Sequence, residues 1–173
     1  MTAIHPGIFK KYDIRGKAMG DDAVLTVEAA RLIGQGIGTF FTRVKKQNRI
    51  VVGRDNRHSS YELQMALMDG LQRASVQVVD IGLVATPLVY WHAVNEGDIG
   101  GVMVTGSHLK PPFNGFKLCL GNRPIYDGDI QQIRSYIESG NLAYGQSAGS
   151  LTTNQGAYRQ YINDIEARVD ISQ

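Results

Sequence analysis

Residues 50–81 read IVVGRDNRHSSYELQMALMDGLQRASVQVVDI, and this stretch decides the fold class of the chain. A short apolar strand at 50–53 is followed by a helical pattern that starts at the capping box Ser59-x-x-Glu62. An apolar run at 76–81 then predicts a second strand. A strand, a helix and a strand in this order are typical of α/β proteins.

The same alternation continues on both sides of this unit. The periodicity predicts three further helices, over 22–42, 86–95 and 127–140, and two further strands, over 101–104 and 116–120. Thr86 is predicted to be the N-cap of the second of these helices, with Pro87 at its first position, while Asp127 caps the start of the third and Gly140 closes it. The pattern predicts an α/β fold, a three-layer α/β/α domain with a mixed, largely parallel sheet, over residues 1–150.

The last part of the chain has a different character. Residues 139–156 are rich in Ser, Gly, Asn and Gln and are interpreted as a linker. An amphipathic helix follows, with Tyr158 and Val169 near its ends, and no later element is left to cover it. We therefore expect residues 151–173 to form a linker helix towards a second domain outside this chain. The alternative is a helix that packs back on its own domain.

Composition sets broad limits on function. The 173 residues are 43% hydrophobic and 20% charged with a net charge of +2, so we expect no nucleic-acid partner. Cys119 is the only cysteine, which excludes an internal disulfide and a cysteine-based zinc site, and its apolar neighbours make it a strand residue. The apolar runs are too short to span a bilayer and the charged N-terminus is no secretory signal, so we expect no membrane partner and a cytoplasmic location.

The chemistry is concentrated in residues 103–117, MVTGSHLKPPFNGFK. Ser107 alone is an ordinary turn serine, but His108, Lys110 and Lys117 lie close to it in sequence. A serine that accepts a phosphoryl group must lose its proton, and the incoming charge must be balanced. Histidine or lysine can take the proton and lysine can balance the phosphate, so the cluster favours a phosphorylated serine.

The remainder of this stretch gives expectations about its shape. Pro111-Pro112 should stiffen the loop. Asn114-Gly115 is a tight-turn dipeptide, and we expect it to fold Lys117 back towards the serine.

Three motifs together resemble those of one enzyme family. The sequences Thr105-Gly106-Ser107-His108 and Asn114-Gly115-Phe116-Lys117 are similar to the phosphoserine loop of the α-D-phosphohexomutases, the phosphomannomutase/phosphoglucomutase superfamily. The stretch 9–16, FKKYDIRG, resembles the N-terminal motif of that family, and 52–57, VGRDNR, resembles its Gly-Arg-Asp-x-Arg strand end. The resemblance covers residues 8–140, although Leu109-Lys110 stands where the family usually has Asn-Pro.

The resemblance implies an activity. Family members have four domains, of which this chain matches the first, and they interconvert hexose 1-phosphate and hexose 6-phosphate of glucose or mannose. An active-site phosphoserine donates its phosphoryl group, and a hexose 1,6-bisphosphate is the intermediate and activator. Mg²⁺ is bound mainly by the second domain. The isolated chain is therefore expected to be inactive and to need the remaining domains of the same polypeptide.

The resemblance also implies site residues. Ser107 would be the phosphoserine and, through its phosphate, a magnesium ligand; His108 and Lys117 would handle the proton and the charge. Tyr12 and Arg15 would approach the active cleft as substrate- or phosphate-binding residues, and Arg15 would help to hold either the phosphoserine loop or the substrate phosphate. Lys110 either adds charge near the phosphate or points to solvent.

Several alternatives stay open at the level of sequence. Arg54, Asp55 and Arg57 either contact the substrate directly or form an ion-pair network that holds the loop. The chain as a whole could be a stand-alone sugar-phosphate-binding or regulatory module without catalysis, which Leu109-Lys110 slightly supports. A serine hydrolase is disfavoured, because no acidic partner for His108 is suggested by the sequence.

Overall fold

A seven-stranded mixed sheet forms the centre of the molecule in the computed structural model, which describes residues 4–145 and 148–169. The strand order is β1-β5-β4-β2-β3-β7, with β6 paired to β5. Strand β5 runs antiparallel to β1, β4 and β6, whereas β2 is parallel to β3 and β4, and β3 to β7. The strands are β1 (Ile14–Lys17), β2 (Arg49–Arg54), β3 (Gln77–Leu83), β4 (Gly100–Val104), β5 (Phe113–Leu120), β6 (Arg123–Pro124) and β7 (Leu151–Thr153).

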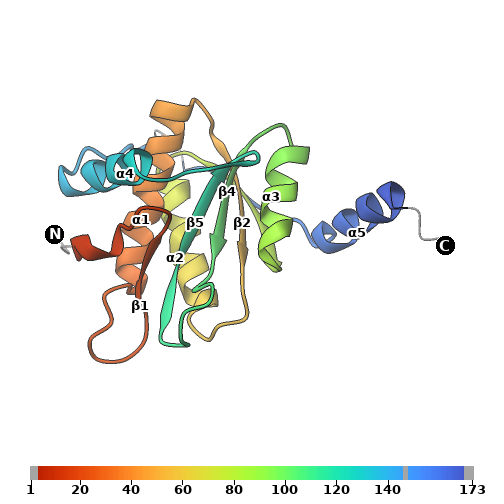
Figure 1. Cartoon of the computed structure of the whole chain (residues 1–173). Helices are drawn as coiled ribbons and strands as arrows, with labels where there is room; N and C mark the ends of the chain where they lie inside the picture. The colour runs from red at the N-terminus through yellow and green to blue at the C-terminus, as the bar shows by residue number, and fades with distance from the viewer. Residues whose placement is uncertain (1–3, 146–147, 170–173) are drawn as a thin grey trace.

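Helices cover both faces of this sheet, as Figure 1 shows. One core is shared by the sheet with α1, α2 and α4, and a smaller core lies under α3 and the start of α5. The predicted three-layer α/β/α fold is confirmed. The helices are α1 (Val27–Phe40), α2 (Ser60–Arg73), α3 (Thr86–Asn95), α4 (Gly128–Glu138) and α5 (Ala157–Arg168), with a 3₁₀ turn at Pro6–Ile8 and a π-helical turn at Phe41–Lys45.

Helices α1 and α2 pack with their backbones in close approach. A Cβ atom on Gly70 would overlap the carbonyl oxygen of Arg31, and one on Gly34 would overlap that of Leu67. Glycine at both positions therefore lets the two helices touch. This contact fixes α2 and, with it, the turn between β2 and α2 that carries Asp55 and Arg57.

Three predicted helix caps are absent. Thr86 is the first residue of α3, so Ala85 takes the cap position in its place. Ser59 and Asp127 precede α2 and α4, but neither side chain makes a capping hydrogen bond. The hydroxyl of Ser59 instead accepts a hydrogen bond from the Asn114 amide, at 2.9 Å. The first predicted helix also begins later than expected, at Val27, where the Thr26 hydroxyl caps it.

The predicted linker contains structure that its composition did not indicate. Residues 151–153 form β7, which pairs in parallel with β3, while residues 146–147 lie outside the described part of the chain. The helix expected to lack a partner packs on α3, because Trp91 Nε1 donates to Asp164 Oδ2 at 2.6 Å and Tyr161 packs against the smaller core. The contact is limited to part of the helix, since Tyr158 and Val169 near its ends are 64% and 50% exposed, and the role of residues 151–173 as a link to a second domain stays a prediction.

Two further expectations can be compared with the structure. Cys119 is buried in β5, and burial raises the pKa of its thiol to about 12, so it stays protonated at neutral pH. No helix in the described residues has the length and apolar character needed to cross a membrane.

Candidate active site

The candidate site lies where two parallel strands end at the same edge of the sheet. Arg54 of β2 and Val104 of β4 are paired, and the N–H of Asp55 continues the pairing by donating to Val104 O at 2.9 Å. The turn after β2 and the loop after β4 are thereby placed side by side. This is the edge at which α/β sheets bind ligands.

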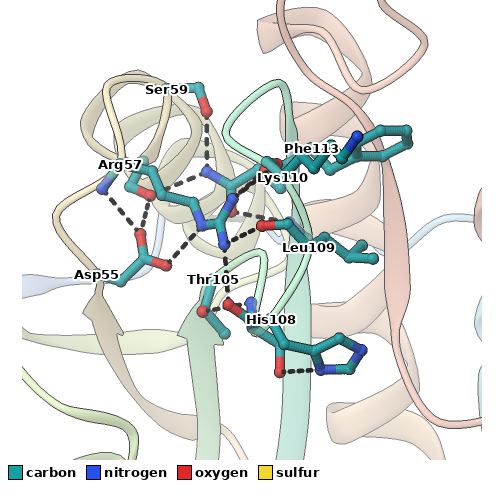
Figure 2. A network of polar contacts seen from close by, with 12 residues as sticks. Asp55, Arg57, Ser59, Thr105, His108, Leu109, Lys110 and Phe113 are labelled. Carbon is teal, nitrogen blue, oxygen red and sulfur yellow. Dashed lines mark hydrogen bonds and ion pairs between the residues drawn. The ribbon is translucent and has the colours of Figure 1, made fainter.

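The Arg57 side chain holds the loop after β4 by binding backbone carbonyl oxygens (Figure 2). Both terminal nitrogens of its guanidinium donate to carbonyl oxygens of this loop, and its Nε lies 3.2 Å from Asp55 Oδ2. A planar guanidinium can make this many directed hydrogen bonds at once, which lysine cannot. The accepting carbonyls belong to Ser107 (2.8 Å), Leu109 (2.7 Å), Lys110 (3.0 Å) and Phe113 (3.0 Å).

Asp55 in turn holds Arg57. Burial alone would raise the pKa of the Asp55 carboxyl, but hydrogen bonds from the hydroxyls of Ser60 and Thr105, the backbone N–H of Arg57 and its positive charge outweigh that effect. The pKa therefore lies below its ordinary value and the group is an anion at neutral pH. Of the two alternatives for Asp55 and Arg57, the structure contains the ion-pair network that holds the loop.

Ser107 is exposed at the start of this loop. Its backbone has φ of 54°, a left-handed conformation that is uncommon outside glycine, and its N–H donates to Thr105 Oγ1 at 2.9 Å. Its Oγ lies 3.4 Å from Nδ1 of His108, so the predicted serine and histidine are adjacent. At Gly106 a Cβ atom would lie 2.5 Å from Arg57 Cζ, and glycine there leaves room for the guanidinium.

The predicted turn at Asn114-Gly115 is wrong. Both residues lie inside β5, and the turn is formed by Pro111 and Pro112. Asn114 is fully buried, where its amide donates to the hydroxyls of Ser59 and Ser60, at 2.9 Å each. The amide has these buried partners, which explains why an Asn-Gly pair here continues a strand.

Strand pairing places Lys117 beside the N-terminal motif. Arg15 in β1 pairs with Gly115 in β5, and Asp13 lies just before β1. The Asp13 carboxylate is shared, with Oδ1 at 3.2 Å from Arg15 Nε and Oδ2 at 3.5 Å from Lys117 Nζ. The two predicted cations are therefore brought together by a carboxylate.

The side chains of three other candidate residues, Tyr12, Lys110 and Arg54, have surroundings of a different kind. Tyr12 is 65% exposed and stacks on Tyr126, with ring centroids 6.3 Å apart. Lys110 is exposed, and its backbone carbonyl is held by Arg57. The Arg54 guanidinium carbon lies 5.4 Å from the centre of the Tyr61 ring.

A hollow of about 340 Å³ opens beside the Ser107 loop and is lined by Ser107, Arg57, His58 and Leu109 among others.

Residues 6–143 match the family model described as phosphoglucomutase/phosphomannomutase, alpha/beta/alpha domain I. The chain belongs to the phosphoglucomutase/phosphomannomutase family. The match includes each of the three motifs singled out in the sequence.

Relatives in this family are much longer than the chain. A phosphoglucomutase of Neisseria meningitidis serogroup B is 41% identical over 164 residues, which are 94% of this chain and 35% of the relative. A phosphomannomutase/phosphoglucomutase of Pseudomonas aeruginosa is 43% identical over 80% of this chain and 29% of its own length. The chain therefore spans about a third of these relatives.

Solved structures show the same likeness. A phosphoglucomutase/phosphomannomutase family protein from Burkholderia thailandensis superposes with a TM-score of 0.88 and 36% sequence identity. The match covers 99% of this chain and 38% of that protein.

The sequence did not predict the supporting roles of some residues of this phosphoglucomutase/phosphomannomutase domain, although Thr105 and Asn114 belong to the motifs quoted for the Ser107 loop. Thr105, Ser60 and Asn114 support Asp55 and the loop, yet each is a common polar residue without a distinctive spacing. Asp13 was visible inside the Tyr-Asp-Ile-Arg-Gly motif, but its contact with Lys117 follows from the pairing of β1 with β5, which the sequence does not display.

Proposed function

We propose that the chain is the N-terminal catalytic domain of a phosphohexomutase that interconverts hexose 1-phosphate and hexose 6-phosphate of glucose or mannose. The observation that carries this proposal is an exposed serine on a loop whose backbone is fixed by Arg57, in a chain of this family. A fixed loop can present Ser107 Oγ in one geometry, which phosphoryl transfer requires.

The proposed reaction has two transfers. In the first, the bond between phosphorus and Ser107 Oγ breaks and a bond forms from phosphorus to the free hydroxyl oxygen of a hexose phosphate, while the proton of that hydroxyl passes to Ser107 Oγ. The product is a hexose 1,6-bisphosphate and a free serine. After the sugar has reoriented, its other phosphoryl group returns to Ser107 Oγ, whose proton moves to the departing sugar oxygen. The bisphosphate also serves as the activator that charges an unphosphorylated enzyme.

The neighbouring side chains have matching proposed roles. His108 Nδ1, 3.4 Å from Ser107 Oγ, can carry the serine proton. Lys117 and Arg15 supply positive charge for the transferred phosphoryl group, and Tyr12 approaches the substrate phosphate. Lys110, exposed on the loop itself, adds long-range attraction for a phosphate.

The remaining parts of the proposal concern what lies outside this chain. The described residues contain no group of three His, Cys, Asp or Glu side chains that could hold a metal. Mg²⁺ would take one oxygen from the Ser107 phosphate, and we assign its other ligands to a second domain, on the resemblance. Residues 1–150 would be the first domain and 151–173 the link to the rest of a cytoplasmic polypeptide, without which this chain has no turnover.

Mass spectrometry tests this function directly. The native polypeptide is purified from its source cells, incubated with a hexose 1,6-bisphosphate and Mg²⁺, and mapped by its peptides. A phosphoryl group on Ser107 together with peptides beyond Gln173 is expected. An unmodified Ser107 in a polypeptide that ends at Gln173 would overturn the catalytic proposal.

A second candidate is a sugar-phosphate-binding module without catalysis. The replacement of the usual Asn-Pro by Leu109-Lys110 favours it, because this change lies directly beside the reacting serine. The two candidates differ in one result, since a binding module retains hexose phosphate without ever exchanging a phosphoryl group at Ser107.

A further inference from the structure

Asp13 is a buried carboxylate that the proposed reaction does not yet use. Only 8% of its side chain is exposed, and a buried charge is costly unless it is paired. Oδ1 accepts no hydrogen bond from the described residues, although Arg15 Nε lies 3.2 Å away as an ion-pair partner. Its surroundings therefore stabilise Asp13 through the charges of its neighbours more than through directed hydrogen bonds.

The two neighbours come from different strands. In β1 and β5, Ile14 pairs with Phe116, and both side chains are fully buried in the core shared with α1. Side chains alternate along a strand, so Asp13, Arg15 and Lys117 lie on the opposite face of the sheet. This arrangement joins the first motif of the chain to the strand that follows the Ser107 loop.

The charges of this cluster do not cancel. Lys117 and Arg15 would repel each other if they shared no anion, and Asp13 lies between them with 3.5 Å and 3.2 Å separations. One negative charge between two positive charges leaves the cluster at +1. The cations are 30% and 36% exposed, so they can attract a phosphate from solvent while the carboxylate stays covered.

We propose that Asp13 is a positioning residue that holds Lys117 and Arg15 in place for the phosphoryl group and cancels one of their two charges. This inference rests on the function proposed above. It assigns two separate effects to one carboxylate. The geometric effect favours transfer, whereas the charge effect opposes the binding of an anion.

Asp13→Asn separates these two effects because the amide keeps the size of the side chain and removes its charge. Inorganic phosphate should bind to the 173-residue chain as tightly as before or about threefold tighter in isothermal titration. Phosphoryl transfer by the polypeptide purified from source cells carrying the substitution should fall about 100-fold, since a small misplacement has that effect. Asp13→Glu, which keeps the charge, should recover part of the transfer rate.

Asp69→Asn is the matched control. Asp69 is also shared by two cations, with Oδ2 at 2.6 Å from Arg31 Nε and 3.2 Å from Arg73 Nη2, but it lies on α2 away from the Ser107 loop. Both readouts should stay within about twofold of the parent. Asp13→Asn would refute the proposal if it left transfer unchanged, or if it weakened phosphate binding and transfer together.

A third measurement separates this inference from the proposed function. If the parent polypeptide shows no transfer at all, the proposed function fails, and the side-chain ¹⁵N resonance of Lys117 then decides the role of Asp13. The resonance should move in Asp13→Asn and stay in place in Asp69→Asn. An unmoved Lys117 resonance in Asp13→Asn would overturn the positioning role.

Discussion

Arg57 Nη2 donates to the backbone carbonyl oxygen of Ser107 at 2.8 Å, although 50 residues separate the two in sequence. The same guanidinium holds three other carbonyls of the loop. The conformation of the candidate nucleophile is therefore set from outside its own loop. Figure 2 shows the arginine at the centre of these contacts.

Arg57→Lys should loosen the Ser107 loop while keeping the charge. An ammonium group cannot reproduce a planar fork of donors, so several carbonyls lose their partner and the free energy of unfolding should fall by about 2–3 kcal/mol. Urea unfolding measures the loss, and hydrogen exchange should accelerate over residues 107–113. Arg43→Lys is the control, because Arg43 is exposed and donates to the Asn141 oxygens, with the Tyr136 ring 5.7 Å from its guanidinium carbon.

The backbone of Ser107 gives a second test. Its φ of 54° is unfavourable for a residue with a Cβ atom and is relieved by glycine. Ser107→Gly should therefore be about 1 kcal/mol more stable than Ser107→Ala in thermal or urea unfolding. Neither variant can accept a phosphoryl group. Equal stability of the two would mean that the loop relaxes out of this conformation.

The lowered pKa of Asp55 predicts that the free energy of unfolding falls in acid. Its pKa is lower in the folded chain than its ordinary value of 3.8, so its contribution to stability is complete above that value. The contribution is lost as the pH falls through the lower, folded value. Asp55→Asn should be less stable at neutral pH and should depend less on pH below about 4, measured by urea unfolding between about pH 2 and 7.

Ser60→Ala provides the intermediate case for this acid sensitivity. It removes one of the hydroxyl donors that lower the pKa of Asp55 but keeps the carboxylate. Its acid limb should lie between those of the parent and Asp55→Asn. Parallel acid limbs for all three chains would contradict the assignment to Asp55.

The contact between α1 and α2 should not tolerate a methyl group. Gly70→Ala pushes a Cβ atom into the carbonyl oxygen of Arg31, which belongs to rigid backbone, and should lower the free energy of unfolding by about 2 kcal/mol or more. Gly128→Ala is the matched control in α4, because a Cβ atom there meets nothing within 4 Å. It should be neutral or slightly stabilising, since alanine favours the helix.

The sequence predicted the layers of this fold well because apolar periodicity reports burial directly. The strands at 50–53 and 101–104 and the helix after Ser59 are present with small shifts in their ends. The short strand β7 was missed, since its three exposed residues carry no alternation and depend on a partner 70 residues or more away.

The sequence pointed to a set of candidate site residues, but it did not predict the contacts that those residues make. Ser107 and His108 are adjacent as expected, because they are neighbours in the chain. The role of Arg57 was left open, since its partners are backbone carbonyls, which carry no residue identity that a sequence could display. Asn114 was misjudged for a similar reason. Its side-chain amide can stabilise a turn or can bind hydroxyls inside the protein, and the sequence does not show which of the two it does.

The hydrogen bonds from Arg57 to the backbone of this loop also affect how the loop sequence can change during evolution. Arg57 binds the loop through carbonyl oxygens, so the same hydrogen bonds can form whatever side chains the residues with those carbonyls carry. Leu109 and Lys110 can therefore be replaced by other residues without loss of a hydrogen bond to Arg57. Side chains at positions 109 and 110 can change while the loop that presents Ser107 keeps its shape.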